Sequence, residues 1–293
     1  MTNENIYTSH AKRDFPPQKQ SRQPGFEYIM NPLPIFDNPN YIGTNKLRNR
    51  TAIISGGDSG IGRAVAVAFA KEGANIVIPY YDEHQDAELT KQVIEGYGSP
   101  CLLIPGDLRS KEHCQLVVKK TLEHFGKIDI LINNAAVQFH QKELTSISDE
   151  QWKLTFEVNI HSFFYLTKAT LPYLKKGASI VNTASQVAYL GEKNLMDYTA
   201  TKGAIVSFTR ALANNVVDKG IRVNAIAPGP FWTPLQPASK PVEEIVTFGN
   251  DVPMKRAGQP YEIAPAYVLL ASDDGSYITG QTIHVNGGSA VSS

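Results

Sequence analysis

The chain has 293 residues, and its 28 lysines and arginines balance 28 aspartates and glutamates, so the formal net charge is zero. Such a balance gives no overall attraction for nucleic acid or an anionic membrane, and two cysteines cannot build a disulfide framework. Because the histidines lack the paired spacing of metal ligands and no apolar run is long enough to span a bilayer, we expect a soluble, cytoplasmic protein with no metal site and no nucleic-acid or membrane partner.

The N-terminal part of the chain differs in composition from the rest. Residues 1–50 hold six of the 18 prolines but only two of the 22 glycines, and they show no sustained helix or strand period. Apolar residues such as Phe26, Ile29 and Phe36 are spread along this part, which is unlike a typical disordered tail. We therefore predict that residues 1–46 form an extended arm that lies against a neighbouring surface, with another subunit as one alternative.

Residues 47–293 are predicted to form one domain, because short apolar runs alternate with helix-length amphipathic stretches and no linker interrupts them. This alternation indicates an α/β fold in which helices cover both faces of a parallel sheet. Strands are expected at 51–55, 75–78, 101–104, 128–132, 179–182, 222–226 and 282–285. Helices are expected from Ile61 to Gly73 and near 86–95, 110–125, 150–175, 196–218 and 260–272.

A glycine-rich turn joins the first strand to the first helix. Gly56, Gly60 and Gly62 frame Asp58, Ser59 and Ile61 in this turn. Without Cβ atoms, such a turn lets a pyrophosphate approach the free N–H groups at the start of a helix, so the spacing suggests a dinucleotide site. The alternative is a plain tight turn whose glycines ease helix packing.

The end of the second strand bears on the choice between NAD and NADP. No lysine or arginine occurs in residues 78–84, whereas Asp82 and Glu83 would repel a 2′-phosphate, and Tyr81 lies beside them. This favours NAD. Binding of NADP is not excluded, because Arg63, just after the glycines, is a candidate for reaching that phosphate from another part of the chain.

Two tyrosines stand four residues before a lysine, a spacing that places both side chains on one face of a helix. Gly191 interrupts the first pair, Tyr189 and Lys193. The second pair, Tyr198 and Lys202, opens an apolar, alanine-rich stretch typical of a helix, and Ser185 lies thirteen residues earlier, just after a buried strand.

With these motifs in this order, residues 47–290 closely resemble the short-chain dehydrogenase/reductase family, and in particular its bacterial members with an extended N-terminus. The resemblance implies a Rossmann-type doubly wound parallel sheet and a homotetramer. Ala136 and Ala188 depart from the family pattern, where glycine is usual, but neither removes a reacting group. The motifs are Gly56-x-x-x-Gly60-Ile61-Gly62, Asp107, Asn133-Asn134-Ala135, Asn159, Ser185, Tyr198-x-x-x-Lys202, and Pro228-Gly229 followed by Thr233.

The resemblance also implies a role for each catalytic residue. Tyr198 would be the general acid/base, and an ammonium group of Lys202 about 5 Å away would lower its pKa by about two units. Lys202 would also bind the nicotinamide ribose, Ser185 would hydrogen-bond the substrate oxygen, and Asn159 would hold a proton-relaying water. The structural alternatives are a helix N-cap for Ser185 and a bond to a neighbouring helix carbonyl for Asn159.

Further cofactor contacts follow from the same resemblance. Asp107, at the end of the third strand, is placed to meet the adenine, with Leu108 beside it, although a turn role is the alternative. The remaining contacts that we expect are made by Asn134, Ala135, Pro228, Gly229, Phe231 and Thr233, of which Asn134 has a structural role as its alternative.

Residues 231–258 are a candidate lid, because four prolines surround a short helical patch at 242–248. The alternative is a segment that only packs. The substrate pocket is expected to include Gln138, Gln186, Val187, Tyr189, Met196 and Trp232.

The predicted function is an NAD(P)-dependent oxidoreductase acting on CH–OH groups of a small or medium alcohol, or on the matching aldehyde or ketone. The alternative is a non-catalytic dinucleotide-sensing or interaction protein of the same fold. A P-loop hydrolase is excluded because no Lys-Ser/Thr follows the glycines.

Overall fold

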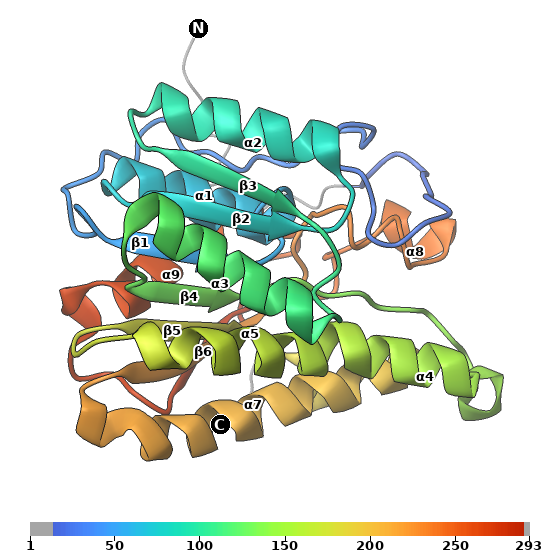
Figure 1. Cartoon of the computed structure of the whole chain (residues 1–293). Helices are drawn as coiled ribbons and strands as arrows, with labels where there is room; N and C mark the ends of the chain where they lie inside the picture. Colours follow the sequence, from blue (N-terminus) through green and yellow to red (C-terminus); the bar gives the residue numbers. More distant parts are fainter. Residues whose placement is uncertain (1–13, 290–293) are drawn as a thin grey trace, which may run out of the picture.

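Seven parallel strands form the central sheet of the computed structural model, which describes residues 14–289 (Figure 1). The strands are β1 (Thr51–Ile54), β2 (Asn75–Tyr80), β3 (Cys101–Pro105), β4 (Ile130–Asn133), β5 (Ser179–Thr183), β6 (Arg222–Pro228) and β7 (Thr282–Val285). Their order across the sheet is β3-β2-β1-β4-β5-β6-β7. This order confirms the predicted doubly wound Rossmann-type fold. The chain reverses direction across the sheet between β1 and β4, and ligands of such sheets bind beyond the carboxyl ends of the strands at this point.

The central strands are buried because both of their faces are covered. Every residue of β1, β4 and β5 is buried. Apolar runs such as 130–132 in β4 are what a parallel sheet between two helical layers requires, and the buried polar residues stand near strand ends, as Ser179, Asn182 and Thr183 do in β5. The pattern is therefore readable in the sequence, and each strand begins within two residues of its predicted start.

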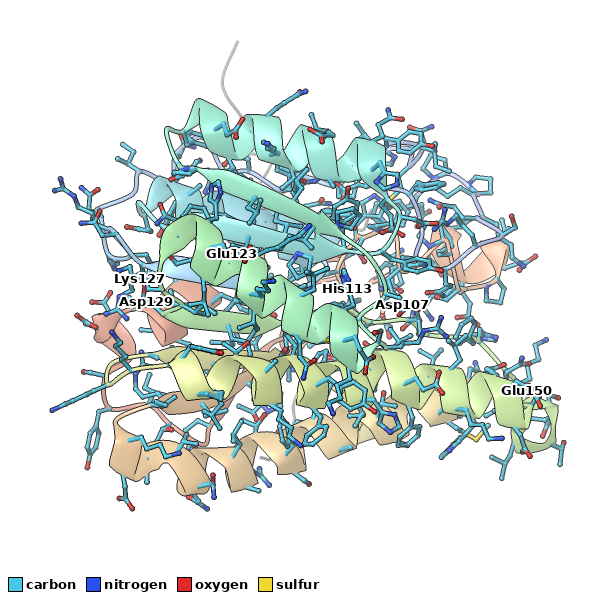
Figure 2. The ribbon with its side chains drawn as sticks, viewed as in Figure 1. Asp107, His113, Glu123, Lys127, Asp129 and Glu150 are labelled. Atoms are coloured by element: carbon cyan, nitrogen blue, oxygen red, sulfur yellow. The ribbon has the colours of Figure 1, made fainter. Side chains whose placement is uncertain are left out.

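Two layers of helices cover the sheet (Figure 1). One core contains side chains from α1 (Gly60–Lys71), α2 (His84–Gly96) and α9 (Pro260–Ala271), and the other contains side chains from α3 (Lys111–Phe125), α5 (Ser162–Thr170) and α7 (Met196–Val216). Figure 2 shows Asp107 and His113 where β3 leads into α3, whereas Lys127 and Asp129 lie at the opposite end of the sheet. The carboxyl ends of the strands therefore face the side of Asp107.

The helix that we expected near 150–175 is interrupted. It consists of α4 (Asp149–Phe156), a π-helical turn (Glu157–His161), α5 and a 3₁₀ turn (Leu171–Tyr173). Single π turns inside helices are frequent at functional sites. The remaining helical elements are short: α6 (Val187–Leu190), α8 (Val242–Val246) and 3₁₀ turns at Leu144–Ser146, Val217–Lys219 and Asp273–Gly275.

Residues 14–46 form an extended strap without helix or strand, and they lie against their own domain. Near its end, the Glu72 carboxylate accepts hydrogen bonds from the backbone N–H groups of Thr44 (2.8 Å) and Lys46 (2.9 Å). At its start, Phe15 stacks on Trp232 with ring centroids 3.8 Å apart. The first 13 residues of the predicted arm lie outside the described residues. Within 14–289, none of the helices combines the length and apolar character needed to cross a membrane.

Candidate active site

A cavity of about 990 Å³ opens at the carboxyl ends of β1, β4, β5 and β6. It runs from the glycine-rich turn to Ser185, which follows β5, and to Tyr198 and Lys202 on α7. All but two of the site residues predicted from the sequence line it. They are Gly56, Asp58, Ser59, Gly60, Ile61, Tyr81, Asp107, Leu108, Asn134, Ala135, Ser185, Tyr198, Lys202, Pro228, Gly229, Phe231 and Thr233.

The glycine turn has the shape of an anion cradle. Gly56 and Gly60 have φ angles of 64° and 53°, in the left-handed region that favours glycine. Gly62 does not line the cavity but sits behind it, where a Cβ atom would come within 1.9 Å of the Gly56 carbonyl oxygen. Asn134 braces the turn from β4, since its Nδ2 donates to the carbonyls of Ser55 (3.2 Å) and Gly56 (3.3 Å). A turn closed this tightly on the start of α1 fits the pyrophosphate of a dinucleotide.

Two buried carboxyl groups line the next part of the cavity, beside Tyr81. Burial raises the pKa of Asp58 to about 6 and that of Glu83 to about 8. The sequence left open that Arg63 reaches a 2′-phosphate. It does not, because it is buried and its guanidinium is bound to Glu27 and Asp86. This part of the cavity therefore suits a neutral sugar hydroxyl better than a phosphate.

Asp107 lies beyond these carboxyl groups, after β3. Arg109 donates to both of its carboxylate oxygens, from Nε at 2.9 Å and Nη2 at 2.6 Å to Oδ2 and from Nε at 3.1 Å to Oδ1. Partial burial would raise the pKa of Asp107, but the hydrogen bonds and charge of Arg109 outweigh it and hold the pKa below its ordinary value. The carboxylate is thus fixed and ionised at the predicted adenine end.

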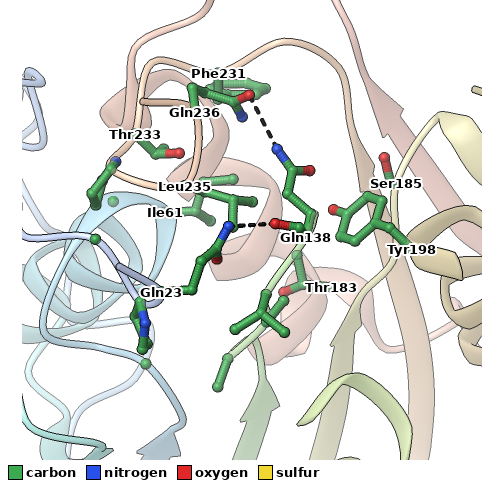
Figure 3. A pocket seen from close by; sticks show the side chains of 18 of the residues that line it. Gln23, Ile61, Gln138, Thr183, Ser185, Tyr198, Phe231, Thr233, Leu235 and Gln236 are labelled. Carbon is green, nitrogen blue, oxygen red and sulfur yellow. Dashed lines mark hydrogen bonds between the residues drawn. The ribbon is translucent and has the colours of Figure 1, made fainter. Parts of the chain in front are cut away.

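Ser185, Tyr198 and Lys202 meet at the other end of the cavity. Tyr198 and Lys202 lie one turn apart on α7, and Ser185 follows β5. Figure 3 shows the hydroxyl groups of Ser185 and Tyr198 next to each other. The Lys202 Nζ donates to the carbonyl of Thr183 at 2.8 Å and lies 5.2 Å from the centre of the Tyr198 ring. The spacing in the sequence thus places all three groups together.

Burial dominates the electrostatics of this triad. It raises the pKa of Tyr198, against the Ser185 hydroxyl, which lowers it, and it lowers the pKa of Lys202 to about 7. We expected the Lys202 charge to bring the Tyr198 pKa down. Loss of water around both groups has the larger effect in this structure, because a lysine without a carboxylate partner is itself costly to charge when buried.

Asn159 is fully buried in the π turn and does not line the cavity. Its side chain accepts from the Val137 N–H and donates to the Val137 carbonyl, both at 2.9 Å, and it also donates to Thr201 Oγ1 at 3.1 Å. These bonds fix the chain after β4 against α7. The carbonyl is not the helix carbonyl of the structural alternative, because Val137 lies in the loop after β4.

The candidate lid, residues 231–258, is tied at its base. Trp232 N–H donates to the Gly258 carbonyl at 2.9 Å, and Gly258 N–H donates to the Pro230 carbonyl at 2.8 Å. Trp232 is fully buried and does not line the cavity, so its predicted place in the substrate pocket is wrong. Tyr189 and Met196 also lie outside the cavity lining, whereas Gln138, Gln186 and Val187 belong to it.

The structure adds polar groups that the sequence pattern did not reveal. Gln236, Lys240 and Glu244 of the lid line the cavity. Lys240 and Glu244 form an ion pair at 2.9 Å, and Gln138 Nε2 donates to Ser239 Oγ at 2.7 Å. Lys240 lies just before α8 and Glu244 within it, so their four-residue spacing is a local signal, but their nearness to Gln138 comes only from the tertiary fold.

Comparison with known proteins places the chain in a family. A family model described as enoyl-(acyl carrier protein) reductase matches residues 56–290. Together with the similarities below, this match shows that the chain belongs to the short-chain dehydrogenase/reductase family.

The chain is similar to proteins of bacteria and plants. It is 59% identical over 283 residues to an uncharacterized oxidoreductase, YhxC, of Bacillus subtilis, covering 97% of this chain and 99% of that protein. It is 50% identical over 281 residues to the chloroplastic NADPH-dependent aldehyde reductase 1 of Arabidopsis thaliana, covering 94% and 98%. A crystal structure of a glucose/ribitol dehydrogenase of the family from Brucella melitensis is 35% identical with a TM-score of 0.75, covering 84% and 99%. These similarities support an oxidoreductase with a nicotinamide cofactor.

Proposed function

We propose that this protein transfers hydride between NAD(P) and an alcohol or carbonyl substrate, with Tyr198 as the general acid/base. The observation that carries the proposal is the position of Ser185, Tyr198 and Lys202 at one end of a cavity whose other end is the glycine cradle. The alternative, a dinucleotide sensor without catalysis, would not need this complete triad.

The bound nicotinamide would accept or supply the hydride, and the chain's own residues would handle the proton. Ser185 donates a hydrogen bond to the substrate oxygen, and Tyr198 takes the hydroxyl proton in oxidation or gives it back in reduction. Because burial raises the pKa of Tyr198, its phenolate needs a nearby positive charge. Lys202, held by the Thr183 carbonyl, supplies that charge when protonated. Asn159 acts as a positioning residue through Val137 and Thr201.

We infer that NAD is preferred over NADP. Asp58 and Glu83 accept hydrogen bonds from a ribose hydroxyl, and the Asp58 carboxylate repels a 2′-phosphate above its pKa of about 6. Arg63 is held by Glu27 and Asp86, and Arg22 pairs with Asp82 and lies 3.3 Å from Glu83. The name of the NADPH-dependent relative from A. thaliana favours NADP instead. Dissociation constants of NADH and NADPH, measured side by side on this protein, show which cofactor it prefers. Asp58→Asn should lower the ratio of the NADPH to the NADH dissociation constant, because it removes the carboxylate that is ionised at neutral pH.

We infer a hydroxylated substrate, because polar side chains line the cavity around and above Tyr198. They include Gln138, Gln186, Glu192, Asn194, Gln236 and Lys240. The glucose/ribitol dehydrogenase among the similar structures fits this inference. A panel that pairs sugar alcohols and aldoses with alkyl alcohols and aldehydes of equal length tests it, with faster turnover expected for the hydroxylated member of each pair.

Tyr198→Phe tests the catalytic assignment. Turnover should fall by at least a factor of about 10³ with dinucleotide binding retained, since only the proton-transferring oxygen is lost. Tyr189→Phe is the matched control, because Tyr189 belongs to the other Tyr-x-x-x-Lys pair and lies outside the cavity lining. Full activity of Tyr198→Phe would refute the assignment. The homotetramer implied by the family is tested by light scattering.

A further inference from the structure

The N-terminal strap forms one wall of the cofactor cavity. Gln23, Pro24 and Gly25 line it together with the glycine turn. Gly25 lies so close to the lid that a Cβ atom there would be 2.7 Å from the Pro234 carbonyl oxygen and 2.9 Å from Ala238 Cβ. The strap and the lid are therefore in close contact at Gly25, beside the cavity.

Gln23 reaches across the opening. Figure 3 shows its side chain extending from the strap, on the side of Ile61, toward Gln138 near the catalytic end. Its Nε2 donates to the backbone carbonyls of Gln138 and Ala238, the latter at 3.3 Å. Because carbonyls only accept hydrogen bonds, these two partners fix which way the carboxamide points.

The other end of this carboxamide is unsatisfied. Gln23 Oε1 is buried and has no hydrogen-bond partner among the described residues. A buried acceptor without a donor costs free energy, so a donor that reaches this atom would be bound favourably. Pyrophosphate oxygens are acceptors and cannot fill this role, whereas a sugar hydroxyl can.

The strap is fixed on both sides of Gln23. On the nucleotide side, Glu27 accepts from the Gly60 N–H at 2.6 Å and pairs with Arg63. On the lid side, the N–H of Gln20 donates to the Pro237 carbonyl at 2.8 Å, and that of Phe15 donates to the Val246 carbonyl at 2.9 Å. Gln23 is thus the middle of a bridge between the two walls of the cavity.

We propose that Gln23 is a cofactor-binding residue supplied by the strap, whose Oε1 accepts a hydrogen bond from a ribose hydroxyl of the bound dinucleotide. The strap then encloses the dinucleotide together with the lid, and the two must separate for the dinucleotide to leave. This inference rests on the proposed function, since it takes the cavity to hold a dinucleotide.

The test compares NADH binding and release in the full-length wild type, Gln23→Ala and Lys19→Ala, with melting temperatures measured without ligand. Lys19 is an exposed residue of the same strap and serves as the matched control. Gln23→Ala should weaken NADH binding about fivefold, as expected for one neutral hydrogen bond, and should speed release in stopped-flow fluorescence. Lys19→Ala should match the wild type. Gly25→Ala, which keeps Gln23 but pushes the strap from Pro234, should also speed release.

The outcomes separate this inference from the function on which it rests. If the wild type binds NADH and Gln23→Ala binds it equally or more tightly with unchanged release, Gln23 is not a cofactor contact and the inference is overturned. If the wild type binds neither NADH nor NADPH, the proposed function fails together with it.

Discussion

Replacing Glu27 by glutamine tests how a buried carboxyl group links the strap to the protein's stability. Glu27 is 1% exposed, and its carboxylate contacts the Arg63 guanidinium and the Gly60 N–H at the start of α1. Both contacts favour the charged form. Burial nevertheless has the larger effect and raises the pKa of Glu27 from 4.5 to about 7.

The size and sign of the effect follow from this shift. A raised pKa means that the folded state binds the proton more tightly than the unfolded state. The stabilisation from protonating Glu27 is therefore fully present below pH 4.5 and is lost as the pH rises to about 7. A difference of about 2.5 pKa units at 1.36 kcal/mol each corresponds to about 3 kcal/mol of unfolding free energy.

The assay is urea unfolding of the wild type and Glu27→Gln at pH 5 and pH 8, without ligand. Glutamine resembles the protonated side chain and does not titrate, so the variant should gain about 2–3 kcal/mol relative to the wild type between the two pH values. Taking the difference between the proteins cancels the groups that titrate in both, including His113, His284 and Lys202. A difference that is the same at both pH values would refute the reasoning.

Two further substitutions test the cradle and the strap. Gly62→Ala places a methyl group 1.9 Å from the Gly56 carbonyl oxygen and should lower NADH affinity more than tenfold. The control is Gly203→Ala, which has open space in α7 and should stabilise the protein by about 1 kcal/mol. Equal NADH affinity in the two variants would contradict the role of the cradle. Phe15→Ala removes the ring stacked on Trp232 and should lower the free energy of unfolding, measured in urea, by about 3 kcal/mol. Ile42→Ala, at an exposed residue of the strap, should leave it unchanged. A loss below 0.5 kcal/mol for Phe15→Ala, on the order of a surface substitution, would show that the strap is not held by this stack.

The parts of the fold that depend on local pattern could be predicted from the sequence. Buried parallel strands carry continuous apolar runs, and the glycine turn needs residues without Cβ atoms, so both leave a direct signal. The spacing of Ser185, Tyr198 and Lys202 gave the catalytic end of the cavity in the same way. All of these features arise within a few turns of chain or follow the family's motif order.

The features that could not be predicted depend on distant parts of the chain. Nothing in the sequence near Gln23 indicates that its side chain bonds to Gln138 and Ala238, which follow it by 115 and 215 positions. The exclusion of Trp232 from the pocket has the same origin, because it packs on Phe15 of the strap. The pKa of Tyr198 depends on burial, which spacing alone does not give. Asn159, in the π turn, likewise bonds to a residue 22 positions earlier, Val137.

The strap has a consequence for the protein's synthesis on the ribosome. It is made before the domain, yet its partners come much later: Trp232 Nε1 donates to the Pro32 carbonyl across 200 positions, and the Ile35 N–H donates to Gln259 Oε1 across 224. Glu27 can meet Gly60 and Arg63 soon after α1 has emerged, but the contacts of Pro32 and Ile35 must wait until nearly the whole domain has been made. Docking of these parts of the strap is then among the last steps of folding, and a nascent chain that stops before residue 232 lacks the surface that holds them.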